Sequence, residues 1–135
     1  MTIELRNDPG LSPPRGFSHA SIAPPGSIIH LAGQLGQDAD GNLAEGLAAQ
    51  IDRALSNVVS ALAAAGAGPE HLAKLMIYIV DWSEDRQGEL VEGLIAAGQR
   101  TRLPEVPITL LGVQALFVDA AVVEIEAVAV VPPTA

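Results

Sequence analysis

The chain has 135 residues, of which 49% are apolar, enough for one domain with a modest packed core. It contains no cysteine, which excludes disulfides, thiolate nucleophiles and cysteine metal sites. The formal net charge is −9, and such an acidic surface repels the phosphate backbone of nucleic acids. No signal-like apolar core opens the sequence, and no run of about 20 apolar residues is present that would span a membrane. We therefore expect a cytoplasmic protein that binds neither nucleic acid nor a membrane.

The amino-terminal part of the chain alternates short extended runs with turns. Residues 3–6 and 19–23 are predicted as short strands, separated by a loop at 7–15 that is rich in proline and glycine. Residues 27–34 are β-branched and apolar, which predicts a longer strand. The turn residues 38–42 (DADGN) follow.

Two helices and three strands are predicted in the remainder. Apolar residues recur at helical spacing after the turn, until glycine and proline interrupt them. The predicted elements are a helix at 43–65, a strand at 72–80, a helix capped by Asp81 or Ser83 and running to about Gly98, and strands at 108–113 and 122–131.

The sequence offers no recognisable metal site. Its three histidines are far apart and lack the ligand spacings of zinc sites. Asp38, Asp40 and Asn42 alternate as in a calcium loop, but the glycine is misplaced and no glutamate closes the loop. We expect no metal or other cofactor.

The order of elements predicts the α+β fold class, with a mixed β-sheet and two helices on one face. In the last predicted strand, Val123 and Ile125 face one way, whereas Glu124, Glu126 and Val128 face the other. Both faces are largely apolar, and an apolar sheet face left in water is unusual for a monomer. We therefore expect a symmetric copy of the chain to cover it.

Several segments together resemble the Rid family, also called the YjgF-like or reactive-intermediate-deaminase family. These segments are GFSHA at 16–20, LAGQ at 31–34, QIDRALSN at 50–57, YIVD at 78–81 and VEIEA at 123–127. They occur in the family's order and cover nearly the whole chain. The resemblance implies one chorismate-mutase-like (RidA-like) domain over residues 1–135. It also implies a homotrimer that binds small molecules in clefts between subunits.

The resemblance further assigns site residues one by one. Gly33, whose backbone meets ligands in the family, and Glu124, the family's water-handling carboxylate, are both retained. The deaminase arginine, which holds the substrate carboxylate, corresponds to Thr109. The remaining substrate-binding positions are Phe17 for the site tyrosine, Ala32 for the serine of the S-G-Q strand and Glu89 for the asparagine of the second helix.

The threonine argues against deamination of 2-imino acids. Threonine donates one neutral hydrogen bond but cannot form the bidentate ion pair that arginine makes with a carboxylate. A basic residue from elsewhere is the alternative, with Arg102 first and Arg100 second. Otherwise both arginines are solvated surface residues.

Glu124 and His19 are the candidate acid–base groups. Glu124 and Glu126 share one face of a strand among apolar neighbours, a setting that suits proton transfer. The alternative for Glu124 is an interface carboxylate paired with an arginine of a neighbouring subunit; Glu126 is interpreted as structural. His19 either lines the cleft or is a hydrogen-bonded structural histidine.

Three functions are compatible with these residues. The first is an enzyme that hydrolyses, deaminates or tautomerises a small carbonyl, imine or enamine metabolite, with Glu124 as the catalytic group. The second is a non-catalytic trimer that binds a small ligand or has a regulatory role. The third is RNA cleavage, which the resemblance allows but the acidic charge disfavours.

Overall fold

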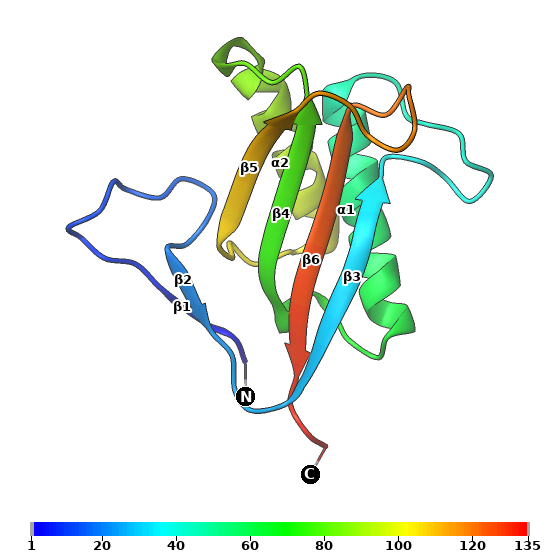
Figure 1. Ribbon diagram of the computed structural model, residues 1–135. Helices are drawn as coiled ribbons and strands as arrows, with labels where there is room; N and C mark the ends of the chain where they lie inside the picture. The colour runs from blue at the N-terminus through cyan, green and yellow to red at the C-terminus, as the bar shows by residue number, and fades with distance from the viewer. Residues whose placement is uncertain (1, 135) are drawn as a thin grey trace.

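Four strands form the main sheet of the computed structural model, which describes residues 2–134. The elements in chain order are β1 (Glu4–Arg6), β2 (Ala20–Ile22), β3 (Ser27–Leu35), α1 (Leu47–Ala64), β4 (Leu72–Val80), α2 (Gln87–Thr101), β5 (Ile108–Val113) and β6 (Val123–Val131). The strand order is β3-β6-β4-β5, and only β4 and β5 run parallel (Figure 1). The predicted α+β class with a mixed sheet is confirmed.

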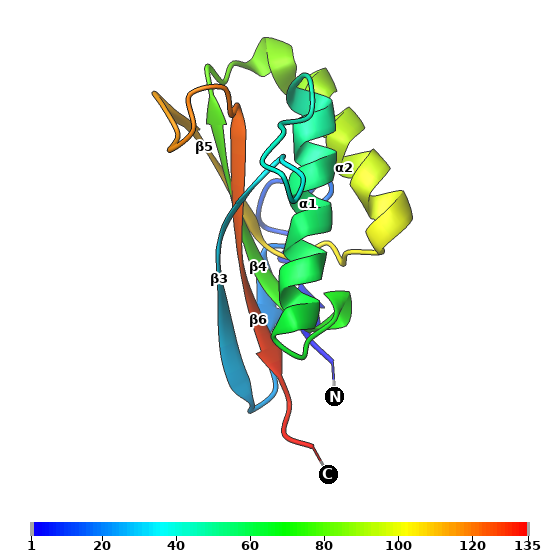
Figure 2. The same cartoon turned by 90° about the vertical axis from the view of Figure 1, so that its right-hand side faces the viewer.

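Both helices cover the same face of this sheet, as Figure 2 shows. They pack closely because Gly93 of α2 has no side chain. A β-carbon at that position would stand 2.8 Å from the carbonyl oxygen of Ala48 and from the Ile51 side chain, both on α1. Within residues 2–134, the other face of the sheet carries no helix (Figures 1 and 2).

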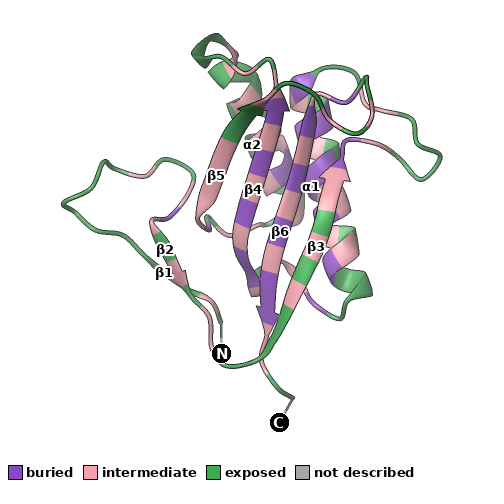
Figure 3. Cartoon of the chain, viewed as in Figure 1, coloured by how far each residue is buried: buried purple, intermediate pink, exposed green. Residues whose placement is uncertain are grey.

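The core lies between the sheet and the helices, and the alternation predicted for the last strand is confirmed. Val123, Ile125 and Ala129 are fully buried, whereas Glu124 and Glu126 on the opposite face are half-buried. Figure 3 shows the same alternation along β4 and β6. Burying each large aliphatic side chain stabilises the fold by about 1.5–3 kcal/mol relative to leaving it exposed.

The helix boundaries differ from those predicted. The first helix begins at Leu47 rather than at residue 43, because Leu43 pairs with Gln37 in an isolated bridge and Gly46 takes a φ of 91°. The second begins at Gln87, after a 3₁₀ turn at Glu84–Arg86, and extends beyond Gly98 to Thr101.

The predicted strands at 3–6 and 19–23 form a ribbon of their own, β1–β2, beside the main sheet (Figure 1). Among the residues that the structure describes, two hydrogen bonds attach this amino-terminal arm to the rest of the fold. Ser21 Oγ donates to the carbonyl of Ala73 at 2.7 Å, and the Ser18 amide donates to the carbonyl of Val106 at 3.3 Å.

Candidate functional site

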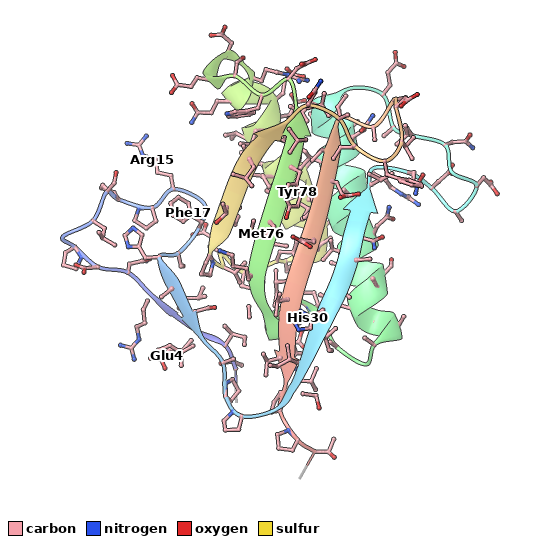
Figure 4. The ribbon with its side chains drawn as sticks, in the orientation of Figure 1. Glu4, Arg15, Phe17, His30, Met76 and Tyr78 are labelled. Atoms are coloured by element: carbon pink, nitrogen blue, oxygen red, sulfur yellow. The ribbon has the colours of Figure 1, made fainter. Side chains whose placement is uncertain are left out.

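Polar side chains gather on the sheet face that the helices leave open. His30, Met76 and Tyr78 project from this face in Figure 4. A hollow of about 250 Å³ on the same face is lined by His30, Lys74, Met76 and Glu126, among others. Because successive strand residues point to opposite faces, Glu124 and Glu126 lie on this face together. We call this surface the open face.

Glu124 lies directly over Gly33 of the neighbouring strand β3. A β-carbon at Gly33 would stand 2.6 Å from the carboxyl carbon of Glu124. The pairing of β3 with β6 is irregular between Leu31 and Gln34, the part of β3 that contains Gly33. Glycine at this position therefore makes the room that the carboxylate occupies, and the structure brings Gly33, Ala32 and Glu124 to one corner of the open face.

Two polar residues of α1 fix the strand ends that carry this corner. The Gln50 side chain accepts a hydrogen bond from the amide of Val122 at 2.9 Å, just before β6 begins. The Asn57 side chain donates to the carbonyls of Leu35 at 2.9 Å and Gln37 at 2.8 Å, where β3 ends. Through these two residues of the QIDRALSN segment at 50–57, α1 supports the site from the other side of the sheet. The sequence analysis identified this segment but did not predict these hydrogen bonds.

Thr109 lies on β5, at the far edge of the sheet from Gly33. Its hydroxyl accepts a hydrogen bond at 3.2 Å from the ammonium group of Lys74 on β4. Lys74 has no carboxylate within ion-pair distance among residues 2–134. The position that the resemblance assigns to the family's arginine is therefore neutral, and the ammonium group of Lys74 lies beside it.

Tyr78 on β4 donates a hydrogen bond from its hydroxyl to Glu126 Oε1. This bond raises the pKa of Tyr78 above its ordinary value of 10.0, with further contributions from burial and from the negative charges of Glu126 and Glu124. Neither Tyr78 nor Lys74 was singled out from the sequence as a site residue. The only signal for them in the sequence is the alternation of β4, which places both side chains on the same face of the sheet.

Phe17 and His19 lie in the amino-terminal arm, where their rings make an edge contact with centroids 6.2 Å apart. His19 is fully engaged there. Its Nδ1 accepts from the amide of Asp8 at 3.1 Å, and Nε2 lies 2.9 Å from the carbonyl of Ser12. Both ring nitrogens are therefore engaged by the loop at 7–15, and His19 holds this loop together.

Glu89, Arg100 and Arg102 lie in or at the end of α2. Glu89 is exposed and pairs with Arg86 at 3.3 Å. Arg100 bonds to Asp52 and Ser56 of α1. Arg102 ends the helix in the left-handed region, with φ 52°, and lines a hollow with residues of the arm. Within a single chain, none of the three joins the open face.

Residues 2–134 contain no cluster of three or more His, Asp or Glu side chains arranged to hold a metal ion. Within the same residues, no helix combines the length and the apolar character needed to cross a membrane.

Comparison with known proteins gives one family. The family model described as Endoribonuclease L-PSP matches residues 10–131. Among solved structures, YyfB from Yersinia pestis, of the conserved Rid protein family, is 30% identical. The match covers 97% of this chain and 100% of that one, with a TM-score of 0.85. Rv2704 from Mycobacterium tuberculosis, a member of the YjgF/YER057c/UK114 family, is also 30% identical, over 86% and 87% of the two chains, with a TM-score of 0.63.

A more distant match supports the fold alone. Escherichia coli TdcF, solved with bound serine, is 23% identical over 96% of this chain and 98% of that one, with a TM-score of 0.68. No curated protein matches the sequence significantly.

Proposed function

Because the chain belongs to the Rid/YjgF family, we propose that it is an enzyme acting on a small carbonyl, imine or enamine metabolite. The reaction is hydrolysis, deamination or tautomerisation, and Glu124 activates water or moves a proton. The observation that carries this proposal is the carboxylate of Glu124 seated over Gly33, with no hydrogen-bond donor of the described chain engaging it. Such a carboxylate is available to a ligand.

A second copy of the chain completes the site in this proposal. The candidate residues of one chain fall into two groups: Gly33, Glu124 and Thr109 on the open face, and Phe17, Glu89 and Arg102 elsewhere. The open face also exposes Ile28 and Leu111, by 63% and 47%. Exposed apolar side chains of this size on a bare sheet face favour burial against another subunit. We propose a homotrimer with ligand clefts between subunits.

Lys74 narrows the class of substrate. Its ammonium group gives the open face a cation beside Thr109, so a substrate carboxylate has a partner there. Lysine binds as a point charge, without the planar two-point grip of arginine. We therefore propose a protein that holds small acids more weakly than an arginine-containing relative would and is a poor 2-imino acid deaminase.

RNA cleavage is not part of the proposal, although the matching family model bears that name. The net charge is −9, and six arginines and one lysine are the only permanent cations of the sequence. Proteins that bind RNA through its backbone need clustered basic groups and lose affinity steeply with salt.

The test is ammonia release from freshly generated 2-iminopropionate, beside a panel of small 2-oxo acids followed for keto–enol exchange. We expect slow ammonia release by the natural protein and a gain of about tenfold or more for Thr109→Arg, the size of one added charged hydrogen bond. On any compound that is turned over, Glu124→Gln should lower the rate by about 10²-fold to 10⁴-fold. Fast imine hydrolysis by the natural protein, with no gain for Thr109→Arg, would contradict the proposal that this protein is a poor 2-imino acid deaminase. Binding of panel compounds without turnover, unchanged in Glu124→Gln, would support a non-catalytic binding protein instead.

A further inference from the structure

The open face carries two carboxylates that look equivalent in sequence but differ in their surroundings. Glu124 and Glu126 stand two residues apart on β6 and point to the same side. Glu126 accepts the hydrogen bond of Tyr78, whereas no donor of the described chain engages Glu124, which lies over Gly33. One carboxylate is therefore held by the sheet, and the other is free.

Tyr78 creates this difference by reaching past its direct cross-strand partner. In the register of β4 and β6, Tyr78 stands opposite Glu124, and Met76 stands opposite Glu126. The hydroxyl nevertheless bonds to Glu126, on the diagonal. A tyrosine hydroxyl has one proton to donate, so the bond to Glu126 uses it.

The other titratable groups of the described chain on this face, Lys74 on β4 and His30 on β3, line the same hollow as Glu126 but donate no hydrogen bond to either glutamate. Lys74 donates to Thr109 instead. From β5, the face receives the neutral side chains of Thr109 and Leu111. The only donor that holds Glu126 within residues 2–134 is Tyr78.

We propose that Tyr78 is a positioning residue for the reaction: it anchors Glu126, so that Glu124 alone exchanges a proton with the ligand. Two unanchored carboxylates on this face would both be open to proton exchange with the ligand, which would divide the role between them. With Glu126 anchored, a single carboxylate governs proton transfer. This inference rests on the proposed function, since it assigns a role within that reaction.

The anchoring itself is tested without any substrate. Tyr78 is the only tyrosine of the chain, so the ultraviolet absorbance of tyrosinate reports on this residue alone. We expect Glu126→Gln to lower the pKa of Tyr78 more than the matched variant Glu124→Gln, because Glu126 is the main cause of the raised value. Equal effects of the two variants, or none, would overturn the inference whatever the catalytic results.

The role in the reaction is tested by the pH dependence of the rate on the best compound of the panel. Tyr78→Phe should change the shape of the pH–rate profile, since it releases Glu126. The double variant Tyr78→Phe with Glu126→Gln should restore the natural shape, since one carboxylate again remains. A merely structural Tyr78 would instead lower the rate equally at every pH, without rescue by the second change, and that result would overturn the inference. Absence of turnover for the whole panel would overturn the proposed function and the inference with it, even where the tyrosine titration came out as expected.

Discussion

Lys74 donates a hydrogen bond from Nζ to Thr109 Oγ1 at 3.2 Å, which joins β4 to β5 on the open face. Lys74 is the only lysine of the chain, and no carboxylate of the described residues pairs with it. A half-buried ammonium group with a neutral partner keeps most of its capacity to bind an anion. A cation therefore lies one strand away from Thr109, the position that the resemblance assigns to the deaminase arginine.

Replacing Lys74 should therefore weaken the binding of small acids. For Lys74→Met, we expect the dissociation constant of pyruvate to rise about tenfold to a hundredfold, the range for a lost hydrogen bond to a charged group. The matched variant Thr109→Val keeps the ammonium charge of Lys74 and removes only a neutral hydroxyl group, so its effect should be about tenfold at most. Isothermal titration calorimetry of the two variants checks this. The same affinity for Lys74→Met and the natural protein would show that carboxylates bind elsewhere.

Gly33→Ala should remove activity while leaving the fold largely intact. The added β-carbon would come within 2.6 Å of the Glu124 carboxyl carbon, so this side chain must move. We expect the rate on any compound that is turned over to fall toward that of Glu124→Gln. Thermal unfolding separates loss of activity from loss of structure. A fully active Gly33→Ala would mean that the seat of Glu124 over Gly33 does not matter for the reaction.

The sequence alone predicted the bounds of β4 and which residues of β6 face the core. The predicted strand at 72–80 coincides with β4, because a 3₁₀ turn at Pro69–His71 precedes it and Asp81, with φ 55°, ends it. In β6, strict alternation separates Val123 and Ile125, in the core, from the glutamates. Local pattern decides both features.

The sequence alone did not predict which strands are neighbours in the sheet. Placing β6 between β3 and β4 brings Glu124 to Gly33 and Glu126 to Tyr78, and no local pattern gives this order. Lys74 was overlooked for the same reason, since its importance depends on Thr109, 35 positions away in the chain. Of these two residues, the resemblance assigned only Thr109 to the site.

Two glycines of α2 should respond oppositely to alanine. At Gly98, an added β-carbon meets no atom within 4 Å, so Gly98→Ala should stabilise the protein by about 0.5–1 kcal/mol through helix propensity. At Gly93, the β-carbon would crowd Ala48 and Ile51, so Gly93→Ala should destabilise by about 1–3 kcal/mol. Urea unfolding of both variants measures the difference. Equal effects would contradict the close packing of α1 on α2.

Stability at high pH should depend on Glu126. The raised pKa of Tyr78 means that the folded chain holds the phenol proton more tightly than the unfolded chain. This contribution is fully present below the ordinary pKa of 10.0 and is lost as the pH rises through the raised value. Between these two values, the free energy of unfolding should fall less steeply for Glu126→Gln than for the natural protein. Identical slopes would show that the Tyr78–Glu126 bond does not persist in solution.

A charge on the open face should dissociate the proposed trimer. Leu111, on β5, is 47% exposed in the single chain, and burying it against another subunit would leave no room for hydration of a carboxylate. We expect Leu111→Asp to sediment as a monomer at concentrations where the natural protein is trimeric. Val91 is the matched control: it is 43% exposed, but lies on α2, in the helix layer that covers the opposite face of the sheet. Val91→Asp should therefore remain trimeric. A monomeric natural protein would contradict the proposed assembly. Dissociation by Val91→Asp but not by Leu111→Asp would show that the subunit interface lies on the helices and not on the open face.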